Sequence, residues 1–93
     1  MLAEVKTALR VTNNAFDEEI IDLIEEARHD LMLSGISADK ANSGDDPLIK
    51  RAIKTFAKAN FGFDNPDADR LMASYDSLKL HLSLAGDYIG QVE

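Results

Sequence analysis

The sequence predicts an all-α fold: a small bundle of three main helices preceded by a short N-terminal helix. Apolar residues recur at spacings of three and four along most of the chain, as they do on one face of a helix. Proline, glycine and capping residues divide these stretches. No segment shows the alternation of a β-strand. The 93 residues are enough for one domain, spanning residues 1–93.

Two helices are predicted in the N-terminal third. The first is short, covers residues 2–9, and ends before the turn-forming residues 12–14. The second runs from about Asp17, its predicted N-cap, to Ser34, and Gly35 is its predicted stop.

The second helix is strongly amphipathic. Phe16 is expected to contact Ile21 across its start. Its apolar side comprises Ile20, Ile21, Leu23, Ile24, Ala27, Leu31 and Met32. Its other side carries Glu18, Glu19, Asp22, Glu25, Glu26, His29 and Asp30. This acidic side is either a solvated surface or an electrostatic contact surface.

Two residues of the second helix depart from this division. Arg28 lies within the apolar side. Either its stem packs while its guanidinium reaches water, or it makes a planar contact at an interface. Leu33 lies on the polar side, as a second small contact point.

The third helix carries a basic stripe. Residues 36–46 are expected to form a polar loop, after which Asp46 caps the helix, Pro47 begins it and about Phe61 ends it. Opposite its apolar residues lie Lys50, Arg51, Lys54 and Lys58, with no acidic residue among them. Like charges at this spacing repel each other, so a compensating acidic surface is expected. That surface is the second helix of the same subunit or of a neighbour; contact with a DNA backbone is a further alternative.

The fourth helix carries two apolar faces. Asn65 and Pro66 are predicted to open it and Gly86 to stop it. One face, formed by Leu71, Tyr75, Leu78, Leu82 and Ala85, fits a core. The second face lies nearly opposite and comprises Ala73, Leu80 and Leu84. Since a helix in a small monomer needs one apolar face, the second indicates contact with another chain.

Composition and motifs argue against several function classes. The net charge of -7 disfavours tight binding of free nucleic acid. The chain has no cysteine, no apolar run long enough to span a membrane, and no catalytic or metal-binding motif. Acidic pairs near helix starts fit caps. No catalytic residue, metal ligand or cofactor is therefore expected, and the chain is not expected to be an enzyme.

The whole arrangement resembles the head–tail connector (adaptor) proteins of tailed bacteriophages and prophages. The stretches that carry the resemblance are EVKTALRV (4–11), DEEIIDLIEEAR (17–28), DPLIKRAIKTFAKANFG (46–62) and SYDSLKLHLSLAGDY (74–88). They cover nearly the whole chain. They are patterns of apolar and small residues, and the family has no catalytic residue to transfer.

The resemblance implies a structural role in the virion. Such proteins form a ring, commonly of about a dozen subunits, under the portal protein. The ring extends the DNA channel, through which DNA passes without specific binding, and offers a platform for the next head-completion or tail protein. Assembly takes place in the bacterial cytoplasm, and no membrane is involved.

The resemblance also assigns roles to parts of this chain. Residues 86–93 are the expected C-terminal tail. The expected portal contacts in this tail are Asp87, Tyr88, Ile89 and Val92. The apolar and charged helix faces described above, and not the resemblance, supply the expected subunit interface: Ala73, Leu80, Leu84, Arg28, Lys50, Arg51, Lys54, Lys58, Glu18, Asp22 and Glu25. The alternative function is a small acidic helical binding module, similar to an inhibitor or antitoxin, that covers a basic partner.

Overall fold

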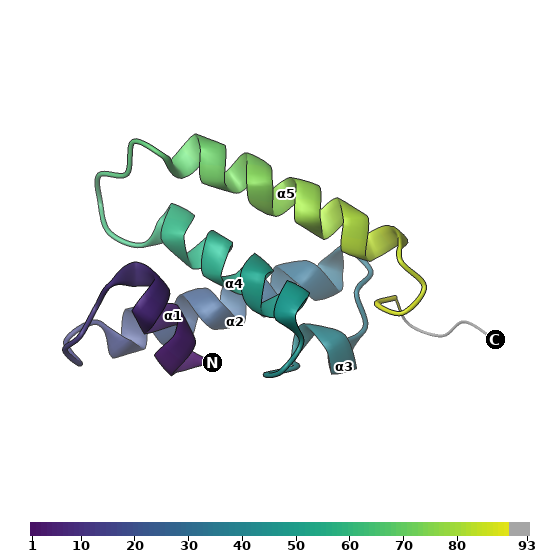
Figure 1. The fold of residues 1–93 in the computed structure, drawn as a ribbon, viewed down its shortest axis with the longest axis horizontal. Helices are drawn as coiled ribbons and strands as arrows, with labels where there is room; N and C mark the ends of the chain where they lie inside the picture. Colours follow the sequence, from purple (N-terminus) through teal and green to yellow (C-terminus); the bar gives the residue numbers. More distant parts are fainter. Residues whose placement is uncertain (90–93) are drawn as a thin grey trace.

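The computed structural model, which describes residues 1–89, has an all-α fold, as predicted (Figure 1). Its helices over this range are α1 (Leu2–Leu9), α2 (Asp17–Leu33), α3 (Ala38–Ala41), α4 (Pro47–Asn60) and α5 (Ala68–Leu84). The β-structure within residues 1–89 is one isolated antiparallel bridge between Ile36 and Ile89.

Helix α4 occupies the centre of the bundle and packs against α5, α2 and α1. In Figure 1, α4 lies in front of α2, and α5 runs beside α4, above it in this view. The molecule is elongated, with extents of 45 × 24 × 18 Å. The α1–α2 and α4–α5 connections lie at one end of the long axis, and residues 85–89, which follow α5, lie at the other (Figure 1).

The core lies where the apolar faces of the helices meet on α4. Ile49 and Ile53 of α4, Ile20 and Leu31 of α2, and Tyr75 of α5 are all fully buried. Val5 is also 0% exposed, so α1 packs on its own bundle. Burying each such side chain contributes about 1.5–3 kcal/mol of transfer free energy, so this small core can hold α1, α2, α4 and α5 together.

Two helix ends follow the sequence signals closely. The Asp46 carboxylate accepts hydrogen bonds from the N–H groups of Leu48 and Ile49 at 2.9 and 3.2 Å, which makes it the N-cap of α4. Gly35, with φ of 104°, closes α2: its N–H donates to the carbonyl of Met32, and the next N–H donates to that of Leu31. A residue with a side chain would be strained at this φ, which explains the glycine.

The start of α2 differs from the prediction. Asp17 is the first helical residue and makes no capping bond; its carboxylate instead lies 2.8 Å from the ammonium of Lys6 on α1. The Phe16 ring packs edge-on against Phe61, with 5.5 Å between the ring centroids. Ile21 is exposed, so its assignment to the apolar side was wrong. Long-range contacts with α1 and α4 override the local capping pattern here.

Two further boundaries were predicted wrongly. The expected loop 36–46 contains the one-turn helix α3, which Ser37 caps by accepting from the N–H of Lys40. Helix α5 begins at Ala68 rather than at Pro66. The Asn65 side chain accepts from the N–H of Asp67 and donates to the carbonyl of Lys58, so it closes the loop back onto α4 instead of capping α5.

Candidate functional site

The basic stripe of α4 forms one side of a shallow groove. Ala8 of α1 and Leu71 and Ser74 of α5 line the groove together with Thr55 of α4. Its cations are Lys50, Arg51, Lys54, Lys58 and Arg70. We call this surface, with these lining residues, the basic groove. The fold thus places the four predicted α4 residues together and adds Arg70 to them.

Few of these cations are neutralised within the subunit. Lys50 lies 3.6 Å from the Glu4 carboxylate, and Arg70 lies 3.5 Å from that of Asp67 in an exposed pair. Within residues 1–89, no carboxylate lies within ion-pair distance of Arg51, Lys54 or Lys58. The expected acidic complement is therefore not supplied by α2 of the same subunit.

The acidic side of α2 is an exposed surface. We define the acidic face as Glu18, Glu19, Asp22, Glu25 and Glu26, all of which are exposed. None of the five forms an ion pair with another residue of the described part of the chain. The face therefore presents five uncompensated carboxylates along roughly two and a half turns of helix.

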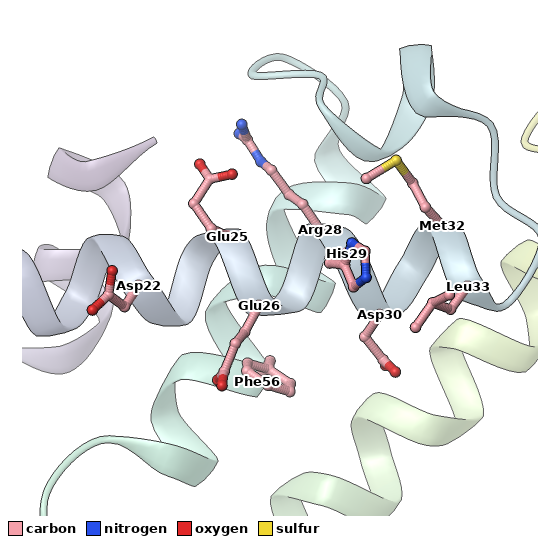
Figure 2. Close-up of a pocket in the computed structure, with 9 residues that line it drawn as sticks. All are labelled: Asp22, Glu25, Glu26, Arg28, His29, Asp30, Met32, Leu33 and Phe56. Atoms are coloured by element: carbon pink, nitrogen blue, oxygen red, sulfur yellow. The ribbon is translucent and has the colours of Figure 1, made fainter.

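A shallow pocket lies along the same helix (Figure 2). Figure 2 shows Glu25, Arg28 and Met32 on one side of α2, whereas Glu26, Asp30 and Phe56 lie on the other. The lining residues therefore flank a helix and do not enclose a ligand cavity. Arg28 is half-buried, and its Nε atom is buried without a hydrogen-bond partner within residues 1–89. Both interpretations of Arg28 stay predictions: its side chain is partly packed, and its Nε is free to donate to another chain.

The second apolar face of α5 points outward. Leu80 is 60% exposed and Leu84 is 75% exposed, and Ala73 is exposed as well. Tyr75 and Leu82, on the other side of the same helix, are buried against the bundle. We call Ala73, Leu80 and Leu84 the outer strip. Leu33 of α2 is also 75% exposed, as its position on the polar side predicted.

A polar joint ties α5 to α2. The buried hydroxyl of Tyr75 donates to Asp30 Oδ2 at 2.7 Å, and Lys79 Nζ donates to the same oxygen at 2.9 Å. Burial and the bond to Asp30 raise the pKa of Tyr75. Burial alone would raise the pKa of Asp30, but the hydrogen bonds from Tyr75 and Lys79 lower it. The joint fixes how α5, and hence the outer strip, is oriented on the bundle.

The C-terminal segment folds back onto the start of α4. The Tyr88 hydroxyl lies 2.9 and 3.1 Å from the two Asp46 carboxylate oxygens, and the Ser37 N–H donates to the Tyr88 carbonyl at 2.8 Å. Lys40 lies 5.0 Å above the Tyr88 ring. We call these contacts, with the Ile36–Ile89 bridge, the C-terminal clasp.

The clasp changes what the predicted portal contacts can do. Asp87 and Ile89 are exposed, whereas Tyr88 is half-buried against its own bundle. Val92 lies outside the described residues.

Sequence reasoning missed two features of the surface. Arg70 joins the basic groove because α5 packs beside α4, and no local pattern links residues of the two helices. Phe63 is fully exposed in the α4–α5 connection. Its place after Gly62, in a short stretch between two helices, was the available signal for an exposed loop aromatic.

Residues 1–89 contain no group of three or more His, Cys, Asp or Glu residues placed to hold a metal ion. No helix within the same range has both the length and the apolar character needed to cross a bilayer.

Comparison with known proteins gives one match. The model of the family described as "Phage connector protein" matches residues 1–89. Neither the curated proteins nor the solved structures yield a significant match. The family match covers the whole described fold, including the basic groove, the acidic face and the outer strip. The chain therefore belongs to the phage connector protein family.

Proposed function

We propose that this phage connector protein forms a ring at the head–tail junction of the virion, under the portal. The ring extends the DNA channel and offers a platform for the next head-completion or tail protein. The observation that carries the proposal is the outer strip, because it is an apolar surface that the subunit itself leaves uncovered.

The outer strip fits a contact between subunits. Leu80 and Leu84 lie one helical turn apart, on the side of α5 opposite the buried Tyr75. The joint from Tyr75 to Asp30 holds α5 in place, so the strip is presented in a fixed orientation. Removing apolar surface from water contributes about 25 cal/mol per Å², which favours covering the two leucines on assembly.

The charge of the chain fits a channel through which DNA moves. A net charge of -7 per subunit gives a ring that repels phosphate groups overall. Such a wall lets DNA pass without specific binding.

The C-terminal segment is the proposed route to the portal. Asp87 and Ile89 are exposed beside the clasp and can contact another protein. Tyr88 would serve mainly to anchor the segment on the bundle, because its hydroxyl is already bonded to Asp46.

A double substitution tests the proposal. Leu80→Glu with Leu84→Glu should leave the subunit helical, since both side chains are exposed, but should abolish rings on the portal because it buries carboxylates in an apolar contact. Circular dichroism checks the fold, and negative-stain microscopy of subunit mixed with portal counts the rings.

A matched control is Leu80→Met with Leu84→Met, which keeps the strip apolar and should keep the rings. Rings that persist in the glutamate variant would contradict the role of the strip. Wild-type protein that does not bind the portal but binds a basic protein would favour the acidic binding module instead.

A further inference from the structure

We propose that the basic groove of one copy receives the acidic face of α2 from a second copy, in a head-to-tail contact. This inference rests on the proposed ring and names which charged surfaces meet in it. Three observations carry it: where the two surfaces lie, how their charges are spaced, and what is left unpaired.

The two surfaces lie on opposite sides of one subunit. Helix α2 packs on α4 through the apolar side of α4, which includes the buried Ile49 and Ile53. The cations of the groove lie on the other side of α4, toward α1 and α5. Figure 1 shows this order, with α4 in front of α2. A subunit therefore cannot place its own acidic face in its own groove, whereas a neighbour can.

Opposite patches are also the geometry that a ring of many subunits requires. Two different patches on each copy give a heterologous contact, which repeats from one subunit to the next. When the patches lie on nearly opposite sides, each subunit turns only slightly relative to the last. Such a contact closes after many copies rather than after two or three.

The spacing of the charges matches along the two helices. Lys50, Lys54 and Lys58 recur every four residues along α4, and Glu18, Asp22 and Glu26 do the same along α2. Four residues of helix rise about 6 Å. Successive cations and carboxylates therefore meet in turn when the two helices lie side by side.

The shape of the groove also suits a helix. Its walls carry the small residues Ala8 and Ser74, and Thr55 lies between the cations of α4. Small side chains leave room for the backbone of an incoming helix to approach, as the close packing of helices requires.

The main effect of this contact is on register. Exposed ion pairs contribute little each, but like charges brought together oppose a wrong alignment strongly. Arg51, Lys54 and Lys58 have no acidic partner within residues 1–89, and neither does the acidic face. Each surface thus repels itself and attracts the other, so copies align head to tail and not face to face.

A duplex DNA backbone is the competing occupant of the groove. Its phosphates would also neutralise the cations. The net charge of -7 and the five free carboxylates of α2 oppose this occupant, whereas they favour a second copy.

Site-specific cross-linking tests the contact without a portal. The chain has no native cysteine, so Ser74→Cys marks the groove and His29→Cys marks α2 beside the acidic face, and neither change removes an acidic or basic group of the two surfaces. A short bis-maleimide should link the two variants, when mixed, at least tenfold more than it links either variant with itself. Ala38→Cys, at an exposed position of α3 outside the groove, the acidic face and the outer strip, is the control.

Equal yields from the mixed pair, the self-pairs and the Ala38→Cys control would overturn the inference. This measurement needs neither ring nor portal, so it can fail while the connector role stands. Loss of rings in the outer-strip variant, together with unselective cross-linking, would keep the proposed function and remove only the charge contact.

Charge reversal gives an independent check on assembly with the portal. Lys54→Glu with Lys58→Glu, and separately Asp22→Lys with Glu25→Lys, should each lower ring yield at least tenfold. All four changes in one chain should restore it, because the repulsion is removed on both sides. Asp39→Lys with Asp45→Lys changes the charge as much as the α2 pair does, at exposed positions outside both surfaces, and should not alter ring yield.

Rings that survive both reversals, or a quadruple variant that stays unassembled while each pair alone still folds, would overturn the inference. Duplex DNA retained by wild type and lost only by the groove variant, without selective cross-linking, would assign the groove to DNA instead.

Discussion

Asp30 does more for the fold than its position on a polar helix side indicates. It accepts the hydroxyl of the buried Tyr75 and the ammonium of Lys79, both from α5, at a single carboxylate oxygen. Hydrogen bonds to a charged group contribute about 1.5–3 kcal/mol each, more than bonds between neutral groups. One side chain thus fixes the position of a whole helix.

The carboxylates of Asp30 and Asp46 make the stability of the fold depend on pH. Burial raises the pKa of Asp30 and Asp46, but their hydrogen bonds outweigh it and hold both values below the usual 3.8. The unfolded chain therefore binds protons at a higher pH than the folded chain, so acid favours unfolding. The stabilisation is complete above the unfolded pKa and is lost as the pH falls through the folded values. We expect the free energy of unfolding, measured with urea, to be steady near neutrality and to fall below about pH 4.

Asp30→Asn provides the control for this prediction. It should lower stability at pH 7, where the charged joint is lost, and lessen the fall in stability at acid pH. Part of the acid dependence should remain because Asp46 is unchanged. An acid fall as steep in the variant as in wild type would show that Asp30 does not contribute to it.

Among the elements, those with strong local signals were predictable from the sequence. Asp46 and Pro47 start α4 as predicted, and Gly35 closes α2, because the required hydrogen bonds lie within a few residues. The one-turn helix α3 was not predictable, because four residues are too few to show a helical period. The prediction for Asn65 was wrong because its side chain donates to the Lys58 carbonyl of α4, earlier in the chain, and does not cap α5.

The candidate surfaces were predictable only in part. The acidic face and the outer strip each lie on one helix, so helical phase alone placed them. The basic groove needs α1, α4 and α5 side by side, and the clasp joins residues 42 positions apart. Pairings over such distances depend on tertiary packing, which a single sequence without its fold does not specify.

The C-terminal clasp yields a prediction about a single element. Tyr88→Phe removes the hydroxyl that donates to Asp46 but keeps the ring and leaves Asp46 free to cap α4. Losing a bond to a charged group weakens the clasp by about 1.5 kcal/mol or more. We therefore expect the Ser37 amide, whose acceptor is the Tyr88 carbonyl, to exchange with deuterium roughly tenfold faster in the variant.

The amide of Phe61 is the internal control, because it donates to the Ala57 carbonyl at the other end of α4, outside the clasp. Its exchange should not change. Unaltered exchange at Ser37 would show that the backbone contacts hold the segment without the hydroxyl.

At the scale of the molecule, the surfaces are distributed so that each can meet a different partner. The groove and the acidic face lie on opposite sides of the α2–α4 pair, and the outer strip lies on α5. Residues 85–89 lie at one end of the long axis (Figure 1). Lateral contacts between copies and axial contacts with other virion proteins therefore need not compete. The arrangement depends on the helices behaving as one rigid unit.

That unity can be tested at α1, the N-terminal helix. Val5 of α1 is fully buried among residues of the common core, so Val5→Ala removes two buried methyl groups and leaves a cavity. We expect a loss of about 2 kcal/mol and a fall in melting temperature of roughly 10 °C. If residues 1–93 are one domain, core amides of α2, α4 and α5 should lose protection from hydrogen exchange together with those of α1. Thr7→Ala, at an exposed position of α1, is the control and should change stability by less than about 1 kcal/mol. Loss of protection confined to α1 would show that the first helix folds and unfolds apart from the bundle that carries the groove.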